Sequence, residues 1–156
     1  MQTIRIGLIS DTHNLLRARA LEALQGSAQI IHAGDICQPD VLDQLAAIAP
    51  VTAVRGNNDV GPWAMRLPAT ALLRIGEISI LAVHDLATLD SDPTASGARV
   101  VVSGHSHRPL VREQRGVLYV NPGSAGPHRF RLPISVAELL IHVGSVEANL
   151  LELSLG

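Results

Sequence analysis

Side chains able to bind a divalent metal ion occur at several separate places along the chain, each directly after a short apolar stretch. Together with one further polar loop they make six segments: Asp11-Thr12-His13, Gly34-Asp35, Gly56-Asn57-Asn58-Asp59, His84, Gly104-His105-Ser106-His107 and Asn121-Pro122-Gly123-Ser124. Carboxylates, imidazoles and an amide oxygen, without a set of thiolates, suit Mn, Fe, Zn or similar ions. The residue types therefore indicate a site for such divalent ions rather than a structural zinc site built from cysteines.

The spacing within two of these segments favours paired ligands. Asp11 and His13 are separated by one residue, as are His105 and His107, so each pair can point to the same side of a tight turn. Asp35 follows a glycine that allows close approach, which makes its carboxylate the natural candidate to bridge two ions. Two ions about 3.5–4 Å apart can clamp a phosphoryl group and activate a water for in-line attack.

The first sixty residues predict elements that would bring these segments together. The order strand, helix, strand, helix, strand is expected over residues 3–9, 15–24, 28–32, 39–49 and 51–54. This alternation is typical of a parallel sheet with crossover helices. Because ligands bind beyond the carboxyl ends of such strands, the first three polar segments should converge.

The second half of the chain predicts hairpins instead. Strands are expected over residues 70–75, 78–83, 99–102, 110–114, 117–120, 135–143 and 146–153, with glycine-containing turns between the paired ones. A short helix is expected within 86–97, although Pro93 and Gly97 weaken it. The fold class expected is α/β (α+β): one domain over residues 1–156, with two mixed or antiparallel sheets face to face and helices outside.

Composition narrows the classes of function. Of 156 residues 47% are apolar and 2% aromatic, and twelve basic against fourteen acidic residues give a net charge of −2. Few aromatic rings and no basic patch argue against an extended nucleic acid as partner. The single cysteine excludes an internal disulfide and fits a reducing compartment, so a cytoplasmic location is expected. No stretch is typical of a membrane span.

These residues, in this order, resemble the calcineurin-like metallophosphoesterase superfamily. The likeness rests on Asp-x-His, Gly-Asp, Gly-Asn, a lone His and Gly-His-x-His, and it extends over nearly the whole chain. The short length and the segments at 54–59 and 121–124 are similar to the small YfcE-type phosphodiesterase branch. The resemblance implies a four-layer β-sandwich of two mixed sheets flanked by helices.

The resemblance also implies a dinuclear site. One metal would take Asp11, His13, Asp35 and His107. The second would take Asp35, Asn57, His84 and His105. Manganese is the first expectation, with Fe, Zn, Ni or Mg as alternatives.

Two positions depart from the pattern of the superfamily. Asn58 stands where many members have a histidine that protonates the leaving group, and an amide donates a hydrogen bond but no proton. Asp85 and Leu86 follow His84 where His-Gly-His is usual, which brings a negative charge close to the expected phosphate site. Asn58, assisted by His105, is expected to act in catalysis.

Other polar residues leave alternatives open. Asn58 would also hold substrate oxygens, and Arg129 is either a substrate-binding residue or part of a surface salt bridge. His32 is expected at an ordinary strand end, with a role behind the metal ligands as the alternative. Cys37 is expected to be a small buried side chain, and His142 to face solvent.

The leading functional hypothesis is an enzyme that hydrolyses small phosphodiesters by attack of a metal-bridging hydroxide. The alternatives are a protein-interaction scaffold that binds metal but catalyses weakly, as in a eukaryotic retromer subunit of this fold, and a phosphomonoesterase. Expected partners are a small phosphodiester and, for the chain itself, a homo-oligomer, either dimer or tetramer.

Overall fold

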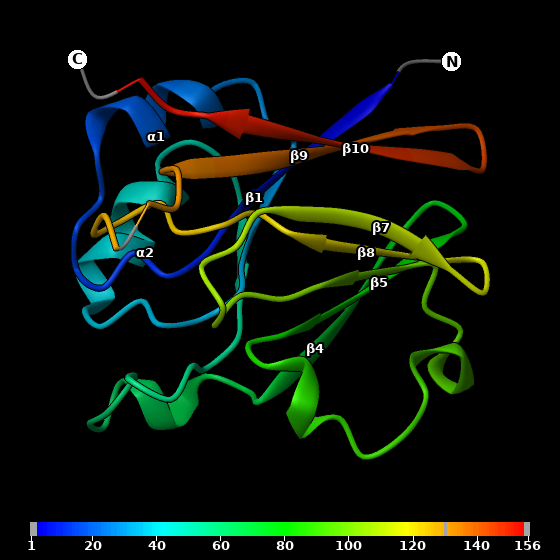
Figure 1. Ribbon diagram of the computed structural model, residues 1–156, viewed down its shortest axis with the longest axis horizontal. Coiled ribbons are helices and arrows are strands. Elements are labelled where there is room, and N and C mark those ends of the chain that lie inside the picture. The colour runs from blue at the N-terminus through cyan, green and yellow to red at the C-terminus, as the bar shows by residue number, and fades with distance from the viewer. Residues whose placement is uncertain (1–2, 130, 155–156) are drawn as a thin grey trace.

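Two five-stranded mixed β-sheets face each other in the computed structural model, which describes residues 3–129 and 131–154 (Figure 1). From edge to edge the first sheet contains β10 (Ser145–Glu152), β9 (Ser135–His142), β1 (Ile4–Ile9), β2 (Gln29–His32) and β3 (Val51–Ala53). The second contains β4 (Thr70–Ile75), β5 (Ile78–Val83), β6 (Val100–Val102), β8 (Val117–Asn121) and β7 (Leu110–Gln114). The expected α/β class with two mixed sheets is confirmed.

Each sheet has a parallel centre and an antiparallel margin. Strands β1, β2 and β3 are parallel, as are β5, β6 and β8, while the hairpins β4–β5, β7–β8 and β9–β10 are antiparallel. The parallel strands of both sheets finish at the same end of the sandwich, on the left in Figure 1. The three hairpin turns lie at the opposite end, on the right. Six strand ends therefore share one end of the sandwich.

The space between the sheets is filled by aliphatic side chains, as three aromatic residues in the whole chain require. The buried side chains of this core include Ile6, Leu8, Ile31, Ile80, Val100, Val102, Leu118, Val120, Leu139 and Ile141. They alternate along each strand with residues that face outward, and in β6 the residues of both faces are buried. This packing fixes the two sheets against each other.

Two helices cover the outer face of the first sheet: α1 (Ala18–Leu24) and α2 (Pro39–Ala46). The helix expected over residues 15–24 starts only at Ala18, because Arg17 is extended, with φ −72° and ψ 144°. Pro39 takes the first position of α2 as expected. In the described part of the chain, no helix has the length and apolar character needed to cross a membrane.

The outer face of the second sheet has a much thinner cover. The segment between β5 and β6 forms two 3-10 turns, η2 (Leu86–Thr88) and η3 (Pro93–Ser96), where a short helix was predicted. Asp85 and Asp92 cap these turns by accepting hydrogen bonds from Ala87 N and Thr94 N. The segment runs below the second sheet in Figure 1, and neither turn buries a residue. A third 3-10 turn, η1 (Ala64–Arg66), precedes β4.

Candidate metal centre

The loops that follow the parallel strands are tied to one another by backbone hydrogen bonds. Asp11 N donates to Gly34 O at 3.0 Å, which joins the loops after β1 and β2. Gly104 N donates to His84 O at 2.9 Å, which joins the loops after β6 and β5. His105 N donates to Asp11 Oδ2 at 3.1 Å and connects the two sheets. The expected convergence of the polar segments is confirmed.

Most of the strained backbone in the described chain lies in these loops. Six of the candidate ligands or their neighbours have φ between 45° and 70°: Asp11, His13, Asn14, Asp35, His105 and His107. Cys37, two residues after Asp35, has φ of 75°. Non-glycine residues adopt this left-handed region at a cost, and they concentrate at functional sites. The turns therefore hold the side chains in directions that a relaxed loop would not select.

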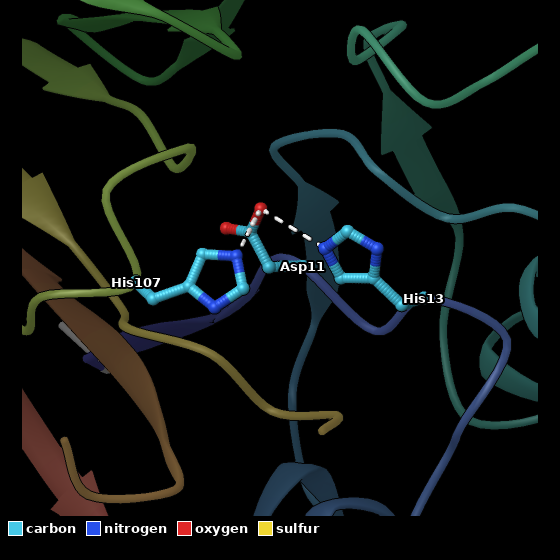
Figure 2. Close-up of side chains that lie close together, drawn as sticks. All are labelled: Asp11, His13 and His107. Atoms are coloured by element: carbon cyan, nitrogen blue, oxygen red, sulfur yellow. Dashed lines mark ion pairs between the residues drawn. The ribbon is translucent and has the colours of Figure 1, made fainter. Parts of the chain in front are cut away.

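Asp11 lies between two imidazoles. Its Oδ1 is 3.8 Å from His13 Nε2 and 3.4 Å from His107 Nε2, and the two rings approach the carboxylate from opposite sides (Figure 2). Ser10 donates a hydrogen bond to the other oxygen, Oδ2, at 2.7 Å. One oxygen of Asp11 is thus fixed by the protein, while the other faces the histidines.

Asp35 lies between the two sets of metal ligands that the family resemblance implies. Its Oδ2 is 3.5 Å from His13 Nε2, which belongs to the first expected set, and 3.3 Å from His84 Nε2, which belongs to the second. His84 Nε2 is also 3.9 Å from Asp11 Oδ1. This position suits a carboxylate that bridges two ions.

Asn57 completes the cluster on the side of the second set. Its Oδ1 is 3.1 Å from His84 Nε2 and 3.2 Å from His105 Nδ1. Ala33 O accepts a hydrogen bond from His84 Nδ1 at 2.7 Å, which orients the ring so that Nε2 faces the carboxylates of the cluster. All seven expected ligand residues are connected by these short distances.

The donor set fits divalent cations. Asp11 Oδ1 and His13 Nε2 are buried and have no hydrogen-bond partner among the described residues. Two overlapping groups of side chains bring their ligand atoms within 4.8 Å of one another: Asp11, His13 and His107, and Asp11, Asp35 and His84. Because unpaired buried polar atoms are costly, a cation between them would satisfy what the protein alone does not.

The two carboxylates differ in pKa. Burial raises the pKa of Asp11, and the hydrogen bond from Ser10 offsets this only in part. Burial also acts to raise the pKa of Asp35, but hydrogen bonds from His84 and Asn58 outweigh it and hold the pKa below its usual value. Asp35 is therefore ionised at neutral pH, as a bridging ligand must be.

Asp59 organises the site from behind, a role that the sequence did not reveal. Its buried carboxylate accepts hydrogen bonds from four backbone N–H groups, those of Asp35, Ile36, Cys37 and Gly56, at 2.7–3.0 Å. It thereby locks the loop after β2 to the loop after β3. The only signal in the sequence is a carboxylate three residues after a glycine, which is common in turns.

His32 is a second residue that holds the loops of the site together without being a candidate ligand. The fully buried ring accepts a hydrogen bond from Gly34 N at Nδ1, so its proton lies on Nε2, 3.1 Å from Thr12 Oγ1. Thr12 Oγ1 in turn donates to Ile36 O. His32 thus joins the Asp11–His13 turn to the loop after β2, which supports the alternative kept open for it rather than an ordinary strand end.

Two glycines allow the loops to approach closely. A Cβ at Gly104 would contact Ser10 Oγ and lie 2.6 Å from Asp11 Oδ2. A Cβ at Gly56 would contact the backbone N and a carboxylate oxygen of Asp35. Both glycines are therefore required by the space next to a candidate ligand.

The remaining candidates lie around this cluster. Asn58 donates from its side-chain amide to Asp35 Oδ2 and from its backbone to Asp35 Oδ1, both at 2.9 Å. Arg129 is exposed. Burial is the main cause of the lowered pKa of His107, and the charge of Arg129 contributes to it. His142 faces solvent, as expected.

The expectation for Cys37 is wrong. The side chain is only partly buried, with Sγ 3.9 Å from His13 Nδ1. Burial and the negative charges of Asp59 and Asp35 raise its pKa to about 11, so the thiol stays protonated. Cys37 reaches the site because its backbone takes a left-handed turn that the sequence did not predict.

Asp85 points towards the cluster from its margin. Its Oδ2 is 3.7 Å from His105 Nε2, on the side of the ring opposite to Asn57. The negative charge that replaces the usual glycine therefore lies beside an expected metal ligand.

The fold and the cluster of candidate ligands are typical of metal-dependent phosphoesterases. Comparison with known proteins agrees with this class. The family model of the calcineurin-like phosphoesterase superfamily domain matches residues 4–144. A probable metallophosphoesterase from Methanothermobacter thermautotrophicus is 34% identical over 158 residues, covering 94% of this chain and 91% of the relative. The chain belongs to the calcineurin-like phosphoesterase superfamily, which confirms the family indicated by the motifs.

Solved structures share the fold. An archaeal phosphodiesterase matches with a TM-score of 0.79 and 22% identity, over 95% of this chain and 100% of the other. The phosphoesterase YfcE from E. coli gives 0.70 and 23%, over 88% and 91%. Vps29 from Chaetomium thermophilum gives 0.77 and 20%, over 97% and 100%. At these identities the likeness concerns the fold alone, which both enzymes and a sorting protein adopt.

Proposed function

We propose that this protein is a dinuclear-metal phosphodiesterase that hydrolyses small phosphodiesters. The observation that carries the proposal is the position of Asp35 Oδ2 between His13 Nε2 and His84 Nε2, at 3.5 and 3.3 Å. One carboxylate shared by two groups of ligands is the arrangement that a pair of ions needs.

The ligands would divide as the resemblance implies. Asp11, His13, Asp35 and His107 would hold one ion, and Asp35, Asn57, His84 and His105 the other. Manganese is the first choice, and Fe, Zn, Ni or Mg are alternatives. When bound, such ions polarise a phosphoryl group and lower the pKa of a water molecule so that it can attack phosphorus.

The protein's own residues favour diesters. Asn58 holds Asp35 Oδ2 with one N–H of its amide and has a second for a phosphoryl oxygen, but it supplies no proton to a leaving group. If His105 binds an ion through Nδ1, the atom that faces Asn57 Oδ1, its proton would lie on Nε2, and this exposed N–H could donate a hydrogen bond to a substrate oxygen. The charge of Asp85 disfavours the second negative charge of a monoester.

Hydrolysis of bis(p-nitrophenyl) phosphate with added Mn²⁺, compared with p-nitrophenyl phosphate, tests the proposal. We expect higher kcat/KM for the diester, and loss of activity in Asp11→Asn and His107→Ala. His142→Ala, which changes an exposed histidine far along β9, should retain wild-type activity. Absence of hydrolysis with every divalent ion, while metal is bound, would contradict the function, and a preference for the monoester would favour a phosphomonoesterase.

A protein-interaction scaffold is the second candidate, and the shared fold with Vps29 is the observation that favours it. The intact ligand set argues for the enzyme. The double variant Asp11→Asn/His107→Ala separates the two, because a scaffold would keep its binding partners while an enzyme would lose its activity. A cytoplasmic location and a homodimer or homotetramer are further parts of the proposal, based on composition and family.

A further inference from the structure

A pocket of about 470 Å³ borders the candidate metal centre at His105. It is formed by the ends of β6, β7 and β8, the loop 104–109 and the start of the segment that covers the second sheet. Its apolar lining consists of Leu86, Pro109, Leu110, Tyr119, Val120 and Leu132. A largely apolar concavity with a few polar groups is the usual form of a small-molecule site.

The pocket is open because the cover of the second sheet is thin. The turn η2 buries no residue, and Leu86 and Leu110 at the pocket remain 40% and 44% exposed. Leu89 and Tyr119 pack against the margin of the buried cluster on this outer face. Apolar side chains are thus exposed next to the site, where a longer helix would have covered the sheet.

His105 and Asp85 connect the pocket to the metal centre. His105 lines the pocket and also faces Asn57 Oδ1 at 3.2 Å. Asp85 lines the pocket while its Oδ2 lies 3.7 Å from His105 Nε2. Arg108 contributes the opposite charge to the lining, so the pocket carries carboxylate and guanidinium groups in equal number. A phosphate held at the cluster would therefore direct one ester group into this space.

We propose that the pocket binds one organic group of the phosphodiester, and that it selects an uncharged group containing a ring that packs against Tyr119. This inference rests on the proposed phosphodiester hydrolysis. The balanced charges disfavour a strongly charged group, and the apolar wall favours a ring over a methyl group, because a ring buries more apolar surface.

Fluorine NMR of protein labelled with a ring-fluorinated tyrosine reports occupancy directly, because Tyr119 is the only tyrosine in the chain. We titrate protein loaded with diamagnetic Zn²⁺ with diphenyl phosphate, an aryl diester whose poor leaving group slows turnover, and separately with dimethyl phosphate. We expect a saturable shift of the single resonance with the aryl diester and none with dimethyl phosphate. The only tryptophan, Trp63, packs in the cluster beneath the helices and provides an unaffected reference when labelled in the same way.

Steady-state kinetics of a variant with a charged side chain in the pocket are the second test of the proposal. Leu86→Glu should raise KM for bis(p-nitrophenyl) phosphate about tenfold with little change in kcat, since the substitution removes apolar contact and adds charge. Leu72→Glu, the same change at an exposed leucine of β4 outside the pocket, is the matched control and should behave as wild type.

The outcomes separate this inference from the proposed function. If the aryl diester is hydrolysed but Tyr119 does not respond, or Leu86→Glu matches Leu72→Glu, the pocket assignment is wrong and the hydrolase stands. If Tyr119 responds but no metal supports hydrolysis, the pocket binds the ring and the proposed function is wrong. An equal response to dimethyl phosphate would overturn the preference for a ring.

Discussion

Individual residues in this site divide into those that face the proposed ions and those that hold them in place. Asp11, Asp35 and His84 are among the candidate ligands, while Asp59 and His32 fix the loops that carry them. Such supporting residues orient ligands and are expected to matter nearly as much as the ligands themselves.

Replacing Asp59 with asparagine should destabilise the protein strongly. The carboxylate accepts hydrogen bonds from four backbone N–H groups. The amide of asparagine has only one acceptor oxygen, and its own NH₂ group would point towards backbone N–H donors. We expect the free energy of unfolding to fall by about 3 kcal/mol in urea denaturation. Asp43→Asn, at an exposed position of α2, is the control and should lie near wild type. A similar small effect in both variants would contradict the role assigned to Asp59.

His32 should make the metal-free protein sensitive to acid. Burial is the main cause that lowers its pKa from 6.5 to about 3. Between these values the unfolded chain binds the additional proton, so stability is lost as the pH falls below 6.5. From pH 6.5 to about 4.5 this amounts to ~2–3 kcal/mol, and His32→Gln should reduce the loss by that amount in urea unfolding at several pH values. Identical pH dependence in both proteins would exclude His32 as the cause.

At the scale of the elements, the two sheets supply different parts of one site. The loops after β1, β2 and β3 carry Asp11, His13, Asp35 and Asn57, and the loops after β5 and β6 carry His84, His105 and His107. Their approach depends on a residue without a side chain at the point of contact, Gly104.

Replacing Gly104 with alanine should weaken metal binding. The added Cβ would collide with Ser10 Oγ and Asp11 Oδ2 and push the loop after β6 away from the loop after β1. We expect the Kd for Mn²⁺, measured by calorimetric titration, to rise at least about tenfold. Gly76→Ala, at a turn with open space around it, strains the backbone without entering the site. Equal Kd values for the Gly104 and Gly76 variants would show that the contact is irrelevant to binding.

The strands, and the clustering of the candidate ligands at their ends, could be predicted because each depends on a local pattern. Apolar runs such as Val100–Val102 mark buried strands, and polar motifs directly follow them. The late start of α1 and the 3-10 turns after His84 could not be predicted. Arg17 stays extended and its side chain donates to Gly126 O, 109 residues away, and Asp85 caps a single turn rather than a helix. The role of Asp59 likewise depends on loop N–H groups more than twenty residues away, which spacing along the chain does not encode.

For the whole molecule, ions bound at this site would connect the two sheets. Metal binding should therefore stabilise the folded state by mass action, by about 2.7 kcal/mol at a free concentration one hundred times Kd. In scanning calorimetry we expect Mn²⁺ to raise Tm by roughly 5–10 °C for a chain of this size. Asp35→Asn should abolish the increase and His142→Ala should retain it. An unchanged Tm in the presence of saturating Mn²⁺ would argue that the cluster does not bind the ion in the folded state.

The hairpin turns lie at the end of the sandwich opposite to this site, and this has a consequence for local opening. The turns near Gly76 and Gly144 approach each other, with Glu77 Oε2 3.8 Å from a Cβ built at Gly144, but the described chain has no charged or metal-binding cluster there. With ions bound, amide hydrogen exchange should be fastest at these turns and slowest at the strand ends that carry the ligands. Transient separation of the sheets would then begin at the hairpin end, and the candidate ligands would stay together while that end opens.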